Sequence, residues 1–255
     1  MVAGMDARRG LFADFTLAMA VLTRLPVASG PPEDGVIAAA CWAFPLVGAG
    51  IGATAAIVFA MAELLGWAPA LAALLAVFAG IVLTGAFHED GLADTADGFG
   101  GGSDAAAKLA IMRDSRHGTY GILALIGSVG LRVAAVAALA SPIDAGLALS
   151  AAHVVSRAAL PPVMHALNPA RPDGLAAAAG QPSLTQALVP VVIGVVIVLV
   201  FLGPGRGAVA LLLSAAAVAA VAALARRQIG GYTGDVLGAV QQIGEITMLL
   251  VAASR

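Results

Sequence analysis

The chain has 255 residues, of which 60% are hydrophobic and only 11% are charged, and its formal net charge at pH 7 is −2. The mean hydropathy is +0.98. A soluble domain of this length is usually about one quarter charged, so this composition is typical of a membrane protein and excludes an ordinary soluble domain.

The first apolar run, residues 11–23, is interrupted by Asp14 and Thr16, and the chain turns at Pro26. A cleavable secretory signal would have an unbroken apolar core, so we do not assign one here. We interpret the run as an amphipathic or re-entrant helix on the cytoplasmic face. A short extra span is the alternative.

Seven later stretches reach or approach the roughly 20 apolar residues that cross a bilayer as a helix. They are residues 36–60, 69–87, 120–140, 145–165, 187–202, 208–224 and 236–252. We therefore predict an all-α, polytopic integral membrane protein with six or seven transmembrane helices. Residues 1–255 are expected to form a single integral-membrane domain.

Basic residues indicate the orientation, because Lys and Arg concentrate on the cytoplasmic side of membrane proteins. Arg132 and Arg157 lie within spans, and only Arg206 and Arg255 lie on the side opposite the N-terminus. The other basic residues share the side of the N-terminus: Arg8, Arg9, Arg24, Lys108, Arg113, Arg116, Arg171, Arg226 and Arg227. This bias places the segment 88–121 in the cytoplasm.

The segment 88–121 gathers acidic, basic and glycine residues in an otherwise apolar chain. If its first part is helical, Asp90, Asp94 and Asp97 follow the spacing i, i+4 and i+7 and point the same way. Three like charges on one face repel one another unless a divalent cation compensates them. Oxygen ligands without a nearby Cys favour Mg²⁺, Mn²⁺ or Ca²⁺. We predict a metal-dependent phosphoryl-transfer site; a solvated loop is the alternative.

The second part of the segment supplies positive charge. Lys108, Arg113 and Arg116 flank Asp114, and the arginine fork fits phosphate oxygens. We expect these basic residues to bind a substrate phosphate, although the positive-inside bias alone is the other reading. Histidine can act as an acid or a base near neutral pH, so His88 and His117 are each either an acid–base group or a hydrogen-bonded bystander.

A second polar cluster lies near the C-terminus, where Asp235, Gln242 and Glu245 recur on one helix face. We expect them either to complete the site or to form interhelical hydrogen bonds. Arg157, inside a span, needs an anionic partner, either a substrate phosphate or a carboxylate such as Asp235. The supporting residues of the predicted site are His88, Asp114, Arg157, Asp235 and Glu245.

Three motifs of ten or eleven residues resemble those of one family, the cobalamin synthases, which are adenosylcobinamide-GDP ribazoletransferases. They are HEDGLADTADG at 88–98, IMRDSRHGTYG at 111–121 and GGYTGDVLGA at 230–239, with shorter matches at 23–26, 44–48 and 156–157. The resemblance covers nearly the whole chain in the family's order. The chain departs from the usual pattern at Glu89 and His117, where the family has an apolar residue.

The resemblance implies a Mg²⁺-dependent enzyme of the bacterial inner membrane that acts late in coenzyme B12 assembly. Such enzymes join adenosylcobinamide-GDP to α-ribazole, or its 5′-phosphate, and release GMP. By position, Asp90, Asp94 and Asp97 would hold the metal, and Asp94 and Asp97 would be catalytic.

The resemblance also bears on partners. We expect a lipid bilayer, other late B12-assembly enzymes and a second copy of the chain as partners, and no nucleic acid. Two other classes stay open: an ion-coupled transporter, because intramembrane acids also mark permeation paths, and a structural membrane subunit.

Overall fold

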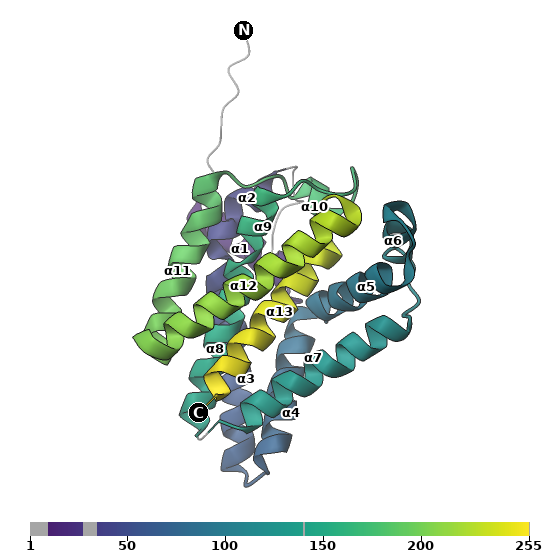
Figure 1. The fold of residues 1–255 in the computed structure, drawn as a ribbon. Helices are drawn as coiled ribbons and strands as arrows, with labels where there is room; N and C mark the ends of the chain where they lie inside the picture. Colours follow the sequence, from purple (N-terminus) through teal and green to yellow (C-terminus); the bar gives the residue numbers. More distant parts are fainter. Residues whose placement is uncertain (1–9, 28–34, 140, 255) are drawn as a thin grey trace.

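A computed structural model describes residues 10–27, 35–139 and 141–254 (Figure 1). Arg8, Arg9 and Arg255, which entered the prediction of orientation, lie outside the described residues. The described chain is helical almost throughout, and its one β-bridge joins Pro169 to Tyr232.

The helices are α1 (Leu11–Leu22), α2 (Val36–Ala40), the short 3₁₀ turn η1 (Cys41–Ala43), α3 (Phe44–Leu64), α4 (Pro69–Thr84), α5 (Phe87–Gly101), α6 (Ala105–Ile111), α7 (Thr119–Ala137), α8 (Pro142–Ala158), α9 (Leu160–Ala166), α10 (Leu175–Ala178), α11 (Leu184–Leu202), α12 (Pro204–Ile229) and α13 (Gly234–Ala253). Six helical segments of the described chain are long and apolar enough to cross a membrane, and α4 with α5 gives a seventh if this bent pair is one span. The predicted all-α, polytopic architecture is confirmed.

The spans differ in how much of their surface the rest of the protein covers. In the most apolar stretch of each, 78% of the residues are buried for α8 with α9 and 67% for α13, but only 22% for α11 and 17% for α12. Figure 1 accordingly shows α8 and α13 between α11 on one side and α5 and α7 on the other, with α12 crossing in front of α13. The polar residues in the interior parts of these two helices, such as His153, Arg157 and Glu245, are therefore enclosed by protein.

Glycines bring α3 against α8. A Cβ atom on Gly52 would lie 2.5 Å from the Cα of Ser150, and one on Gly48 would collide with the carbonyl oxygen of His153. Small residues at such positions let membrane helices approach backbone to backbone. This contact fixes the position of His153 and its neighbours on α8.

Helix α1 is a separate element with 12 residues. At 1.5 Å per residue it is about 18 Å long, too short for the roughly 30 Å hydrocarbon core. Leu17 and Leu22 are buried, whereas Leu11 and Phe12 are exposed, and Asp14 accepts a hydrogen bond of 3.2 Å from the indole of Trp42. These features fit a helix that packs on the bundle, and they disfavour the extra span.

The predicted span 69–87 is broken in the structure. Helix α4 ends at Thr84, and α5 begins at Phe87 after a turn of 90° between the two helices. Gly85 and Ala86 both adopt left-handed backbone conformations, with φ of 67° and 57°. The turn sends α5 across α13, where a Cβ on Gly238 would lie 3.0 Å from the Cα of Gly91.

Candidate active site

Asp90 and Asp94 lie on one face of α5, because the segment is helical, which is the condition under which the sequence predicted a shared face. A carboxylate oxygen from each and a ring nitrogen of His117 all lie within 4.8 Å of one another. Asp90 and His117 are exposed, and Asp94 is half-buried. The three side chains converge where α5 faces the loop before α7.

Asp97 has a different environment from the other two aspartates. It is buried, and its two oxygens accept hydrogen bonds from the backbone N–H groups of Gly118, at 2.7 Å, and Gly121, at 2.8 Å. A Cβ on Gly118 would lie 2.5 Å from Oδ1 of Asp97, so this approach requires glycine. The structure thus joins Asp97 to the start of α7 and leaves it outside the three-donor cluster.

The predicted phosphate-binding residues lie between Asp94 and His117 in the sequence. In the structure, both arginines among them contact protein carboxylates. Arg113 binds both oxygens of Asp173, at 2.6 and 2.8 Å. Arg116 hydrogen bonds to Asp114, and this contact lowers the pKa of the Asp114 carboxyl to about 2. Lys108 is buried on α6 and packs against Gly102.

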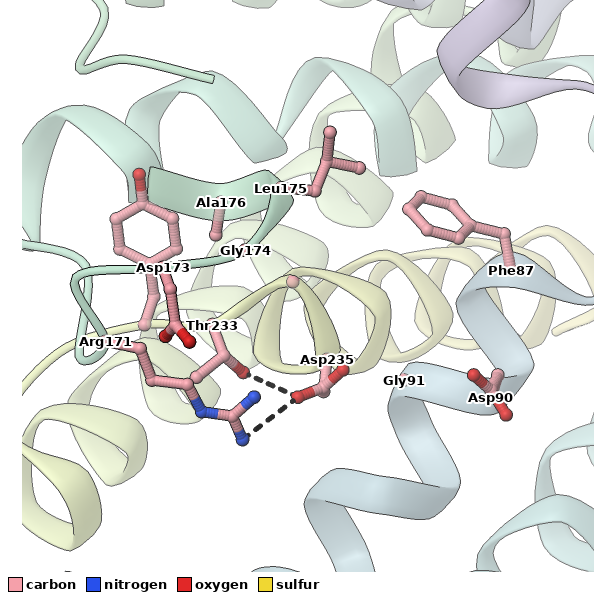
Figure 2. Close-up of a pocket in the computed structure, with 12 residues that line it drawn as sticks. Phe87, Asp90, Gly91, Arg171, Asp173, Gly174, Leu175, Ala176, Thr233 and Asp235 are labelled. Carbon is pink, nitrogen blue, oxygen red and sulfur yellow. Dashed lines mark hydrogen bonds and ion pairs between the residues drawn. The ribbon is translucent and has the colours of Figure 1, made fainter. Parts of the chain in front are cut away.

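A pocket of about 170 Å³ opens beside Asp90 (Figure 2). Its polar wall holds Asp235, which accepts a hydrogen bond of 3.1 Å from Thr233 and lies 3.6 Å from Arg171. The lining residues are Phe87, Asp90, Gly91, Arg171, Asp173, Gly174, Leu175, Ala176, Tyr232, Thr233, Gly234 and Asp235. The pocket therefore combines an unpaired carboxylate with a guanidinium.

Sequence reasoning missed Arg171 as a site residue and treated it only as part of the positive-inside bias. Arg171 reaches the pocket because its segment is tied to the α12–α13 turn: Ala170 donates to the carbonyl of Tyr232 at 2.7 Å, and Tyr232 donates to that of Asn168 at 3.0 Å. Local residue spacing cannot predict this contact, because the two segments are some 60 residues apart in the sequence.

A network of buried charges lies inside the bundle. Glu245 contacts Arg132 at 3.0 Å, Arg157 at 2.8 Å and His153 at 3.1 Å, and Glu89 contacts Arg132 at 3.0 Å. Two carboxylates thus face two guanidinium groups, the balance that makes buried charges tolerable.

The network corrects one expectation. The carboxylate partner of Arg157 is Glu245, not Asp235, because Glu245 lies three turns further into α13, at the depth of Arg157. Asp235, in the first turn of α13, contacts Arg171 instead. Of the two readings of Gln242 and Glu245, the structure shows the alternative, interhelical hydrogen bonds, since Gln242 accepts from Ser128 at 2.6 Å and donates to Glu89 at 3.0 Å.

His88 also lies inside the bundle. It is 2% exposed, its ring packs edge-on against Phe87 at a centroid distance of 5.3 Å, and neither ring nitrogen has a hydrogen-bond partner among the described residues. It is not among the residues that line the pocket beside Asp90.

These features define a class of protein, a multi-pass helical membrane protein with a polar site at one end. Among the described residues, the site has the unpaired carboxylates of Asp90 and Asp94 and a pocket that contains the guanidinium of Arg171, and the charged network lies next to it inside the bundle. Among soluble and membrane proteins alike, such convergent, unpaired titratable groups beside a pocket indicate an enzyme site.

The comparisons with known proteins identify the family. Residues 14–253 match the family of cobalamin-5-phosphate synthase. A relative from Bradyrhizobium diazoefficiens, named adenosylcobinamide-GDP ribazoletransferase, is 50% identical over 255 residues, which cover 100% of this chain and 98% of the relative. A relative of the same name from Mesorhizobium japonicum is 47% identical over 96% of this chain and 94% of its own length. No solved structure matches the chain.

The chain therefore belongs to the cobalamin-5-phosphate synthase family and is a transferase. The resemblance found in the three sequence motifs is confirmed.

Proposed function

We propose that this chain transfers the cobinamide-phosphate group of adenosylcobinamide-GDP to α-ribazole or its 5′-phosphate, and releases GMP, in a Mg²⁺-dependent reaction. The observation that carries the proposal is the convergence of Asp90, Asp94 and His117 within 4.8 Å beside a pocket that contains Arg171. The names of the relatives support the choice of substrates.

The donor set fits a hard divalent ion. Asp90 and Asp94 offer carboxylate oxygens from one helix face, and Mg²⁺ in proteins is usually held by one or two carboxylates together with waters and substrate phosphates. When bound, Mg²⁺ would neutralise charge on the pyrophosphate and on the departing GMP. Asp97 stays a predicted third ligand.

The reaction balances as a single displacement at phosphorus. A ribose hydroxyl of the ribazole forms a P–O bond to the phosphorus that carries the aminopropanol arm, and the bond from that phosphorus to the oxygen bridging to GMP breaks, with its electron pair leaving on GMP. Asp94, half-buried, takes the proton of the hydroxyl. Asp97 supports catalysis by holding the loop of Gly118 and the start of α7.

Basic side chains hold the phosphate groups. Arg171 faces the pocket, where it lies 3.6 Å from the partly exposed carboxylate of Asp235, and it also donates to the carbonyl of Leu109 at 3.1 Å. Arg113 and Arg116 form exposed ion pairs, which contribute little in water, so a substrate phosphate can replace their carboxylates. Lys108, close to them on α6, adds positive charge.

We also propose that the chain lies in the bacterial inner membrane with this site in the cytoplasm, where nucleotides are made. The basic residues near the site support this orientation. A second copy of the chain and other enzymes of late B12 assembly are the proposed protein partners.

The test uses the full chain, purified in detergent and supplied with adenosylcobinamide-GDP and α-ribazole. We expect cobalamin and GMP in equal amounts with Mg²⁺ and neither with EDTA. Asp94→Asn should lower turnover at least about hundredfold, the usual contribution of a positioned acid or base. The matched control is Asp104→Asn, because Asp104 caps α6 and asparagine caps a helix equally well.

Product formation in EDTA, or near-normal turnover of Asp94→Asn, would contradict the proposal. Uptake of a solute into proteoliposomes without GMP release would favour the transporter class instead. Binding of both substrates without turnover would favour a structural subunit.

A further inference from the structure

The loop before α7 contributes a nitrogen donor to the cluster on α5. We infer that His117 is a metal ligand in this chain and that Asp90, Asp94 and His117 together form a site for a divalent transition-metal ion such as Mn²⁺. The inference rests on the proposed metal dependence and changes its ligand set from carboxylates alone to two carboxylates and an imidazole.

The first argument comes from the partners of the aspartates. Among the residues that the structure describes, Asp90 and Asp94 are the aspartates whose side chains form neither a hydrogen bond nor an ion pair. The others have partners: Asp14 with Trp42, Asp97 with Gly118 and Gly121, Asp104 with Ala107, Asp114 with Arg116, Asp144 with Ser141, Asp173 with Arg113, and Asp235 with Thr233. The two free carboxylates are neighbours on one face of one helix.

The second argument is the distance of His117 from them. Its ring nitrogen lies within 4.8 Å of both carboxylates, yet the described residues show no ion pair of 4.0 Å or less between His117 and either one. Atoms that share a small divalent ion at about 2.1 Å lie up to about 4.2 Å apart. Because Asp90 and His117 are exposed, small rotations of their side chains suffice to reach this spacing.

The third argument is the way in which His117 is held. The residue after it, Gly118, donates its backbone N–H to Asp97 at 2.7 Å, and Gly121 donates to the same carboxylate at 2.8 Å. Asp97 is one helical turn from Asp94 on α5, so the carboxylate ties the His117 loop to the helix that carries the other two donors. Asp97 is thus a positioning residue for His117.

An imidazole changes the metal preference of such a site. Mg²⁺ is bound in proteins through carboxylates, waters and phosphates, whereas Mn²⁺, although it also suits carboxylates, belongs to the first-row transition metals that bind sites with nitrogen ligands. Replacing His117 should therefore weaken the binding of Mn²⁺ more than that of Mg²⁺. The alternative is that His117 only offsets the negative charge of Asp94 without binding a metal.

The experiment loads the full chain in detergent with Mn²⁺ alone, without substrates, and records pulsed electron paramagnetic resonance. We expect modulation from a directly bound ¹⁴N nucleus, lost in His117→Leu, together with at least about tenfold weaker Mn²⁺ binding and a smaller loss for Mg²⁺. The matched control, His165→Gln, should keep the ¹⁴N signal, because His165 contacts the Pro182 carbonyl away from the cluster.

Bound Mn²⁺ without a ¹⁴N signal, or a signal that survives in His117→Leu, overturns the role of His117 and leaves the carboxylate site standing. Absence of Mn²⁺ binding to folded wild-type protein overturns this inference, whereas the proposed Mg²⁺ dependence is decided separately by turnover with Mg²⁺ and with EDTA. Turnover with Mg²⁺ in His117→Leu but not in Asp94→Asn separates the two proposals further.

Discussion

Glu89 and Asp90 are neighbours in the sequence but have opposite environments. Successive residues of an α-helix point about 100° apart, so Asp90 faces the pocket while Glu89 is buried against Arg132 and Gln242. Inside a membrane protein an unpaired charge costs several kcal/mol. The Glu89 contacts therefore fix the rotation of α5, and with it the direction in which Asp90 and Asp94 point.

We expect Glu89→Gln to lower the free energy of unfolding by about 3–5 kcal/mol, because Glu245 is then the one carboxylate facing Arg132 and Arg157. The double variant Glu89→Met/Arg132→Met restores charge balance, and we expect it to recover much of this loss. Thermal unfolding in detergent measures both. Glu63→Gln, outside the network, is the control, and an effect of Glu89→Gln no larger than the control would contradict the role of the network.

At the scale of whole helices, the close packing of α3 on α8 requires a residue without a Cβ atom at particular positions of α3. Gly52 and Gly50 are two residues apart on α3, but a Cβ on Gly52 meets the backbone of Ser150, whereas a Cβ on Gly50 has no neighbour within 4 Å. Because α8 carries His153 and Arg157, a shift of this contact also shifts the charged network.

The two glycines provide a matched comparison. Gly52→Ala should destabilise the protein by about 1–3 kcal/mol through overpacking, while Gly50→Ala should be neutral or slightly stabilising, since alanine favours a helix by up to about 1 kcal/mol over glycine. Unfolding midpoints in detergent check the pair. Equal midpoints would mean that α3 and α8 tolerate a wider separation than the structure has.

The helices and the site differ in how far the sequence predicts them. Apolar run length predicts six of the seven expected spans to within about five residues at each end, because the bilayer sets that length. Helical periodicity also predicts that Asp90 and Asp94 share a face. The break at Ala86 was not predictable, because a non-glycine residue there takes a left-handed conformation only in the context of its packing.

The remaining site residues depend on contacts between distant segments. The pairing of Arg157 with Glu245 joins residues 88 positions apart, and the bond from Gly118 to Asp97 spans 21. Arg171 reaches the pocket through a comparable long-range contact. Residue types and spacing predict that such groups need partners, but only the fold selects which partners they find.

At the scale of the whole molecule, most of the described basic residues outside the buried network lie at one end. Lys108, Arg113, Arg116, Arg171 and Arg226 lie on α6, the loops near it and the end of α12, whereas Arg206 lies at the other end, at the start of α12. Figure 1 shows α6, α10 and the α12–α13 turn at the same end, opposite the α3–α4 turn and the C-terminus. The candidate site is on the basic end, and by the positive-inside rule this distribution supports the proposed cytoplasmic orientation.

Single cysteines test this orientation in a Cys41→Ala background, which removes the one native cysteine, a buried residue. Ser103 precedes α6 at the basic end, and Ala68 precedes α4 at the other; both are exposed. In bacteria with a permeabilised outer membrane, we expect a membrane-impermeant maleimide to label Ala68→Cys at once, and Ser103→Cys only after the inner membrane is opened. The reverse pattern would put Asp90 and Asp94 on the periplasmic side of the inner membrane, away from the nucleotide substrate. It would contradict both the proposed orientation and the proposed reaction.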